Sequence, residues 1–210
     1  MLRRILIVVV TVMILACLAG CATTKIIVSW KDETAPGRSL KRPLVLAIVP
    51  SQVVRGRMED EFVASLGRLG VAGVASYRYF PDIQAITPDA VRLQMASSGC
   101  DGVLVARFRD VTEEVVDHPA RTVVYETGFD RSHHQGSFSN YYARSVQVIS
   151  SPGYSYVART YRLETAVYSG GEDRLLWSAE TETDDTGSVD KVIVDFTRVI
   201  LEDLRKKQVL

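Results

Sequence analysis

The first half of the chain alternates continuous apolar runs with segments whose apolar residues recur every three or four positions. Leu44–Val49 is apolar throughout and lies between prolines, which predicts a central strand covered on both faces. Gly56–Gly70 has helical spacing, and Val71–Tyr79 has the alternation of a strand. A second helix is predicted from Thr87 to Gly99, and Val103–Phe108 follows as a third strand. This order predicts parallel pairing with right-handed crossovers.

The pattern changes after Thr112. Residues 113–155 are rich in Tyr, Ser, Gly and His and contain several glycines and prolines. Within them, Val123–Glu126 and Ser145–Ile149 are predicted to be strands of a long hairpin, because a wholly structureless loop of this length is unusual in a compact domain.

The last part of the chain returns to regular alternation. Tyr156–Tyr168 and Arg174–Thr183 flank the turn residues Gly170-Gly171, which predicts an antiparallel hairpin. Ser188 caps a final helix whose apolar residues form one stripe, so this helix must pack on the sheet. The predicted fold class is therefore α/β, with a mixed sheet that is parallel at its start, antiparallel at its end and covered by a C-terminal helix.

The amino terminus has the layout of a signal peptide. Arg3 and Arg4 precede the apolar run Ile5–Ala16, which is too short to span a bilayer. Leu18-Ala19-Gly20-Cys21 then fills all four positions of a lipobox, so the segment resembles a bacterial lipoprotein signal. The resemblance implies cleavage after residue 20 and a diacylglyceryl group on Cys21. An uncleaved anchor or an ordinary signal peptide is the alternative.

This interpretation divides the chain into three parts. Residues 1–20 form the signal peptide, residues 21–42 form a lipidated tether with a short strand at Lys25–Trp30, and residues 43–210 form a single α/β domain. Cleavage removes 20 of the 210 residues and leaves 190. The loss of Arg3 and Arg4 reduces 25 basic residues to 23, against 25 acidic ones, so the mature chain lacks the basic surface of a nucleic-acid-binding protein.

Few residues suggest chemistry. Cys17 is lost with the signal and Cys21 carries lipid, so Cys100 has no intramolecular partner and is expected to be a small buried residue. His133-His134 lacks further metal ligands nearby. The acidic pairs Glu113-Glu114 and Asp184-Asp185 point to opposite faces of their strands and do not converge on one bond. We expect no metal, no cofactor and no catalytic residue.

Two charged groups belong to the first helix. Glu59, Asp60 and Glu61 are expected in its first turn, where the helix dipole favours acids. Arg55 and Arg57 lie at its N-terminus and are expected to be a solvated pair, with an anion site as the alternative.

Aromatic residues gather in residues 113–155 and just beyond. Tyrosine is amphipathic and loses little entropy when it is ordered, so such a surface can serve recognition. The alternative is that the rings pack the hairpin against the sheet. The candidate binding residues are Tyr125, Phe129, Phe138, Tyr141, Tyr142 and Tyr154, with Tyr156 beside them.

Several stretches taken together resemble a family of uncharacterised bacterial lipoproteins built on one small α/β domain. They are Ser29-Trp30-Lys31-Asp32, Pro43–Val49, Ser76-Tyr77, Gly99–Val105 and Leu175-Leu176-Trp177-Ser178. The arrangement also looks like the amino-terminal domain of the translocation protein TolB and the domain of the curli secretion lipoprotein, in fold only. The resemblance brings no catalytic residues.

The sequence thus predicts an envelope lipoprotein that acts as a non-enzymatic binding or assembly module. Its partners are the membrane, through the lipid anchor, and an envelope protein or polymer, but no nucleic acid. By resemblance to sorting in two-membrane bacteria, Ala22 after the cysteine indicates the outer membrane, with the domain facing the periplasm. The alternative is an enzyme that acts on an envelope polymer or lipid through an unidentified site.

Overall fold

A computed structural model describes residues 23–34, 39–126, 146–171 and 173–210. The chain forms two compact units: unit 1 contains the described residues up to Thr112 and from Arg159 onward, and unit 2 is formed within Glu113–Ala158. The signal peptide, Cys21 and the histidine pair at 133–134 lie outside the described residues.

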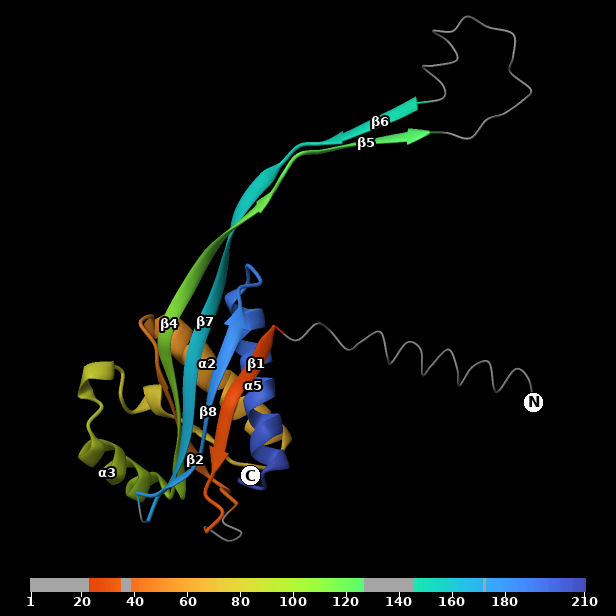
Figure 1. The fold of residues 1–210 in the computed structure, drawn as a ribbon. Coiled ribbons are helices and arrows are strands. Elements are labelled where there is room, and N and C mark those ends of the chain that lie inside the picture. The colour runs from red at the N-terminus through yellow and green to blue at the C-terminus, as the bar shows by residue number, and fades with distance from the viewer. Residues whose placement is uncertain (1–22, 35–38, 127–145, 172) are drawn as a thin grey trace, which may run out of the picture. The chain divides into compact units, whose positions relative to one another are not determined.

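Unit 1 is organised around a six-stranded mixed sheet (Figure 1). Its strands, in spatial order, are β1 (Thr24–Lys31), β8 (Leu175–Asp184), β7 (Tyr154–Ser169), β4 (Gly102–His118), β2 (Pro43–Ile48) and β3 (Val74–Ala75), of which β4 and β7 also extend into unit 2. β2 pairs in parallel with β3 and β4, whereas β8 pairs antiparallel with β1 and β7. The predicted mixed sheet, with a parallel start and an antiparallel end, is confirmed.

Each helix begins where a hydroxyl side chain accepts a backbone hydrogen bond. Ser51 precedes α2 (Gln52–Arg68), Thr87 precedes α3 (Pro88–Ser98), and Ser188 precedes α5 (Val189–Lys206). α3 ends at Gly99, whose φ of 65° is a left-handed conformation that glycine adopts without strain. Two short 3₁₀ helices, η1 (Ser76–Arg78) and η2 (Ile83–Ala85), connect β3 to α3.

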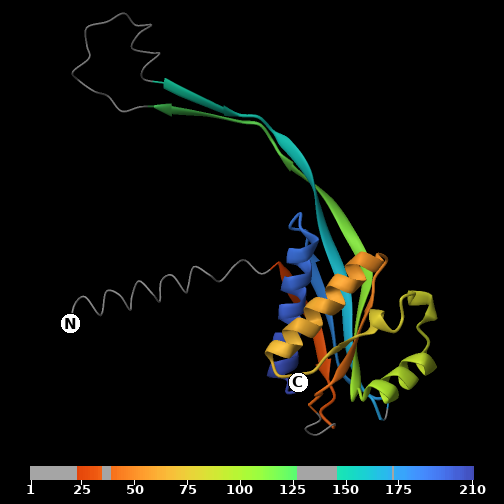
Figure 2. The same ribbon diagram turned by 180° about the vertical axis from the view of Figure 1, so that it is seen from behind.

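α2 and α5 lie side by side on one face of the sheet (Figure 2). Phe62 of α2 meets Phe196 of α5 edge to face, with ring centroids 5.8 Å apart. Trp177 of β8 is completely buried in the same core. The apolar stripe predicted for the last helix therefore packs on the sheet, although Val189 at its start is half exposed.

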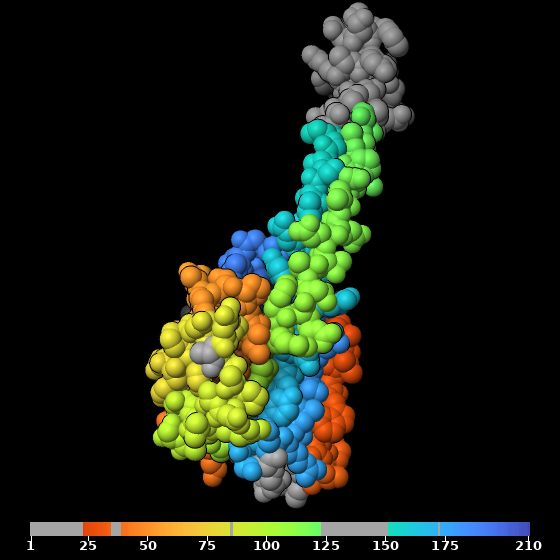
Figure 3. Space-filling model, turned by 90° about the vertical axis from the view of Figure 1, so that its left-hand side faces the viewer, coloured from red at the N-terminus to blue at the C-terminus, as the bar shows by residue number. Residues whose placement is uncertain are grey.

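α3 covers part of the opposite face. Leu44 and Leu46 of β2 pack there against Met95 of α3 and Val103 of β4. The strands β7, β8 and β1 lie uncovered beside this cluster (Figure 3). Cys100, which was predicted to be buried, packs against the cluster but is only half buried.

One prediction about the first helix and one about the strand after it were wrong. α2 starts at Gln52 because Ser51 supplies the cap, so Glu59, Asp60 and Glu61 lie beyond its first turn. Val71–Tyr79 is not one strand: only Val74–Ala75 pairs with β2, and the backbone then turns into η1. The Ser76 carbonyl accepts hydrogen bonds from the amides of Tyr79 and Phe80, which closes this turn.

The β1–β8 pairing contains an irregularity. The register shifts between Ile26 and Val28, so β1 has one extra residue there. Beyond the shift, Ser29 and Lys31 lie opposite the buried Ala179 and Trp177, on the face of the sheet that α5 covers. Val28 and Trp30 face the uncovered side, where both are about half exposed.

Unit 2 is a two-stranded antiparallel segment. It contains the end of β4, the start of β7, and the pair β5 (Arg121–Glu126) and β6 (Val146–Ser151), in which Val123 lies opposite Ile149. The two strands of the predicted hairpin are confirmed. Between the pairs, the strands are interrupted by Pro119-Ala120 on one side and Pro152-Gly153 on the other. A Cβ on Gly153 would lie 2.7 Å from the Ala120 nitrogen, so only glycine fits there.

Candidate functional site

Three aromatic rings stack in unit 2. His118 ends β4, while Tyr154 and Tyr156 lie at the start of β7, two positions apart and therefore on one face. The His118 ring is 4.7 Å from Tyr154 and 5.8 Å from Tyr156, at interplanar angles of 22° and 12°. We call these three residues the aromatic stack.

The aromatic stack is exposed to solvent. Tyr154 retains 62% of its accessible surface and Tyr156 retains 49%, and His118 is also exposed. Large rings that stack without being buried keep their apolar area available for a partner. The rings are held in place by one another and by the strand pairing, so they have little conformational entropy left to lose.

The opposite face of the same segment also carries exposed apolar side chains, beside the polar Asp117 and Ser155. Val115 of β4 is 65% exposed, and Val157, the neighbour of Tyr156, is 48% exposed. Neighbouring residues of a strand point to opposite faces, so Val157 lies behind the aromatic stack. An isolated two-stranded segment is only marginally stable in water. Exposed apolar side chains therefore lie on both faces of this segment.

The sequence identified part of this surface. Of the six candidate binding residues, Tyr154 belongs to the aromatic stack, while Phe129, Phe138, Tyr141, Tyr142 and the side chain of Tyr125 lie outside the described residues. Sequence reasoning missed His118. The sequence did contain a signal for it. Pro119 follows β4 and Pro152 precedes β7, so the two prolines mark matching interruptions in paired strands and place His118 opposite the start of β7.

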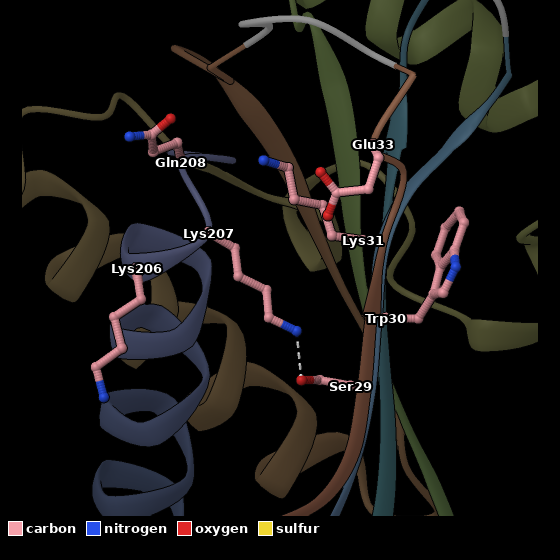
Figure 4. A pocket seen from close by; sticks show the side chains of 7 residues that line it. All are labelled: Ser29, Trp30, Lys31, Glu33, Lys206, Lys207 and Gln208. Atoms are coloured by element: carbon pink, nitrogen blue, oxygen red, sulfur yellow. Dashed lines mark hydrogen bonds between the residues drawn. The ribbon is translucent and has the colours of Figure 1, made fainter.

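A second candidate is a shallow hollow of about 480 Å³ between β1 and the end of α5 (Figure 4). Lys207 Nζ lies 2.5 Å from Ser29 Oγ and 3.5 Å from Asp203 Oδ2. The Asp203 carboxylate therefore neutralises the charge of Lys207. Trp30 projects to the other side of β1, away from Lys207. Lys31 and Lys206 add positive charge at this end of unit 1, but the hollow has no buried polar group that would orient a ligand.

The uncovered sheet face is ordered by ion pairs. Glu164 of β7 accepts hydrogen bonds from Arg107 at 2.6 Å and Arg109 at 2.9 Å, and these bonds hold the pKa of Glu164 below its ordinary value. On the neighbouring strands, Lys25 and Arg162 both pair with Glu182. The charges satisfy one another, so this face is polar but not strongly charged.

One cluster combines a hydroxyl with a carboxylate, as a nucleophile and base would. Ser76 Oγ donates to Glu59 Oε1 at 2.9 Å and accepts from Arg55 at 3.0 Å. All three side chains are completely buried, so no substrate reaches the hydroxyl. The expectation that Arg55 is solvated was wrong, because Glu59 lies one helical turn away and neutralises it.

Among residues 23–34, 39–126, 146–171 and 173–210, no three His, Cys, Asp or Glu side chains gather as metal ligands would. The helices in the described part of the chain are too short or too polar to cross a bilayer.

Comparisons with known proteins give distant structural likenesses. No family model matches the chain, and no curated protein matches it. Similar solved structures include a PelC dodecamer from Paraburkholderia phytofirmans, at 14% identity and a TM-score of 0.46, covering 86% of this chain and 96% of PelC. Another is the lipoprotein GNA1162 from Neisseria meningitidis, at 11% identity and a TM-score of 0.41, covering 79% and 98%.

Proposed function

We propose that this chain is a lipid-anchored, non-enzymatic binding module of the bacterial envelope, and that unit 2 carries its recognition surface. The lipobox Leu18–Cys21 supports the anchor, and Ala22 supports placement at the outer membrane. The observation that carries the binding role is the aromatic stack, three exposed rings on a two-stranded segment with exposed valines behind them.

The partner is an envelope protein. A flat polymer chain can stack on His118, Tyr154 and Tyr156, but it covers only one face of the segment. Val115 and Val157 face the other way, and covering both faces requires a partner that encloses the strands. A protein groove does this, and rigid aromatic residues at its centre dominate the binding energy of such interfaces.

Site-specific crosslinking in intact cells tests this role. A benzophenone amino acid in place of Tyr156 is expected to yield a discrete protein adduct. The adduct should disappear when His118→Ala and Tyr154→Ala remove the neighbouring rings. The matched control is the same photoreactive residue in place of Tyr79 of unit 1, a tyrosine that is 46% exposed. Adducts of equal yield at both positions, or an adduct that contains glycan and no second protein, would contradict the proposal.

The anchor is tested separately. Cys21→Ser removes the thiol that the lipid requires, so the variant should accumulate as an uncleaved precursor that incorporates no radioactive fatty acid. Equal fatty-acid labelling of the variant and the wild type would end the lipidation proposal while leaving the recognition surface to the crosslinking result.

A further inference from the structure

The amino-terminal end of the described chain is held tightly. Thr23 donates its backbone N–H and its hydroxyl to Asp195 Oδ2, at 2.6 and 2.9 Å, and the Thr24 amide donates to the same oxygen at 2.9 Å. The Thr23 carbonyl accepts the amide of Asp184 at 3.0 Å. Arg198 pairs with the other Asp195 oxygen. We call Thr23, Thr24, Asp195 and Arg198 the amino-terminal clamp.

The clamp stays charged at neutral pH. Burial acts to raise the pKa of Asp195, but the hydrogen bonds from Arg198, Thr23 and Thr24 outweigh it, and the pKa lies below its ordinary value. The buried hydroxyls of Thr24 and Thr183 add a contact at 2.9 Å on the neighbouring strand. The first residues of β1 are therefore fixed to both β8 and α5.

The distance from this clamp to the lipidated residue is short. Only Ala22 separates Thr23 from Cys21, and two residues of chain reach at most about 7 Å. A flexible linker of tens of residues would let a domain tumble freely above a bilayer. A connection of two residues from a clamped strand does not allow such tumbling.

We infer that unit 1 is held on the membrane in one orientation, with the end formed by the starts of β1 and α5 and the end of β8 nearest the lipid headgroups. This inference rests on the proposed lipidation of Cys21. Thr24 lies opposite Thr183, so this membrane-facing end includes the loop from Asp184 to Ser188. It also includes Arg159, where β7 enters unit 1 and whose carbonyl accepts the Asp185 amide at 2.8 Å. The other end of β1, at Lys31, lies about 23 Å away along the strand.

Both ends of unit 1 carry charges of both signs. The membrane-facing end has Asp184, Asp185 and Asp190, and Arg57 pairs with Asp190 at 2.8 Å. The far end has Lys31 and Lys206 around the hollow, together with Glu33. The covalent anchor and the clamp, rather than a difference in charge, therefore set the orientation.

Energy transfer to labelled lipids tests the orientation. The lipidated protein, with Cys100→Ser, receives a donor fluorophore at Thr186→Cys in the membrane-facing end or at Glu33→Cys at the far end. Both positions are exposed. In vesicles of phosphatidylcholine with an acceptor-labelled lipid, transfer from position 186 should exceed transfer from position 33, and added phosphatidylglycerol should not reverse the order.

Two variants isolate the cause. A flexible Gly/Ser insertion between Ala22 and Thr23 should abolish the difference between the two positions, because the tether no longer limits rotation. Asp195→Ala should reduce it, because Thr23 and Thr24 lose their acceptor. Arg57→Ala is the matched control. It removes an exposed ion pair to Asp190, which lies on α5 as Asp195 does, and it does not touch the clamp. Circular dichroism confirms that each variant is folded.

The outcomes separate the two proposals. An intact mass without lipid would overturn the lipidation of Cys21 and, with it, the orientation. A lipidated protein with equal transfer at both positions, or with greater transfer at position 33, would overturn the orientation alone. Greater transfer at position 186, lost on insertion of the linker, supports both.

Discussion

Arg55 Nε lies 2.9 Å from Glu59 Oε1, and neither side chain retains any exposed surface. Glu59 also accepts the amides of Ala47 and Tyr77, at 3.1 and 2.8 Å, and the hydroxyl of Ser76. One carboxylate thus joins α2 to β2 and to η1. A buried ion is tolerated only when its hydrogen bonds are satisfied in this way.

Removal of one member of this pair should be severe. Arg55→Met leaves the Glu59 carboxylate without its cation, which typically costs about 3–5 kcal/mol in a buried site. Urea denaturation followed by circular dichroism measures the free energy of unfolding. Arg57→Met is the control, because Arg57 and Asp190 are exposed and their ion pair should contribute little. Equal losses in both variants would show that the buried pair has no special role.

Replacing either of two buried threonines with valine should stabilise the protein. Among the described residues, the hydroxyls of Thr165 and Thr197 are buried and have no hydrogen-bond partner. Valine keeps the shape and removes the unsatisfied hydroxyl, so Thr165→Val and Thr197→Val should each stabilise the protein by about 1 kcal/mol. Thr181→Val is the matched control: its hydroxyl is also buried but donates to the Leu163 carbonyl at 3.2 Å, so this change should destabilise. Thermal unfolding distinguishes the signs.

The two tryptophans should report on different environments. Trp177 is fully buried and its indole N–H donates to Asp203 at 2.9 Å, whereas Trp30 is 49% exposed. The Trp30→Phe variant should therefore emit at shorter wavelength, resist quenching by acrylamide, and shift to the red on unfolding. The Trp177→Phe variant should be readily quenched in the native state. Similar quenching in both folded variants would contradict the described core.

Stability should fall in acid partly through Glu164. Its pKa is lowered by Arg107 and Arg109, so the folded state favours the charged carboxylate. A carboxylate whose pKa is lowered by folding stabilises the folded protein at pH values above the unfolded-state pKa of about 4.5. This contribution to stability is lost as the pH falls through the folded-state pKa. Glu164→Gln should therefore lose less stability than the wild type between pH 6 and pH 3. Glu33→Gln, an exposed control, should follow the wild-type profile.

Local signals in the sequence were sufficient for most elements. Thr87-Pro88 and Ser188 mark helix starts because capping involves only neighbouring residues. The parallel start of the sheet and its last hairpin followed from the order of the elements, whereas the pairing of β1 with β8 was not predicted. Val71–Tyr79 was predicted wrongly because its alternation resembles that of a strand. The turn at Ser76 depends on Glu59, which is distant in sequence and accepts the Tyr77 amide.

The candidate site was less predictable for a similar reason. Tyr154 could be chosen by composition, but His118 enters the aromatic stack only through pairing of β4 with β7. The spacing of Arg55 and Glu59 is visible in the sequence, yet their burial depends on Ser76 and the backbone of Ala47. Solvation of charged groups is a property of the tertiary structure, and residue type alone does not reveal it.

The irregularity in β1 makes this edge of the sheet a poorer template for a second strand. β1 is an edge strand with exposed Ile27, Val28 and Trp30, a composition that invites a second molecule to extend the sheet. The extra residue between Ile26 and Val28 disturbs the regular spacing of the outward N–H and C=O groups that an incoming strand would have to match. Growth into an intermolecular fibre is thereby disfavoured at the longer edge of this described sheet, where the strand nonetheless keeps exposed apolar side chains.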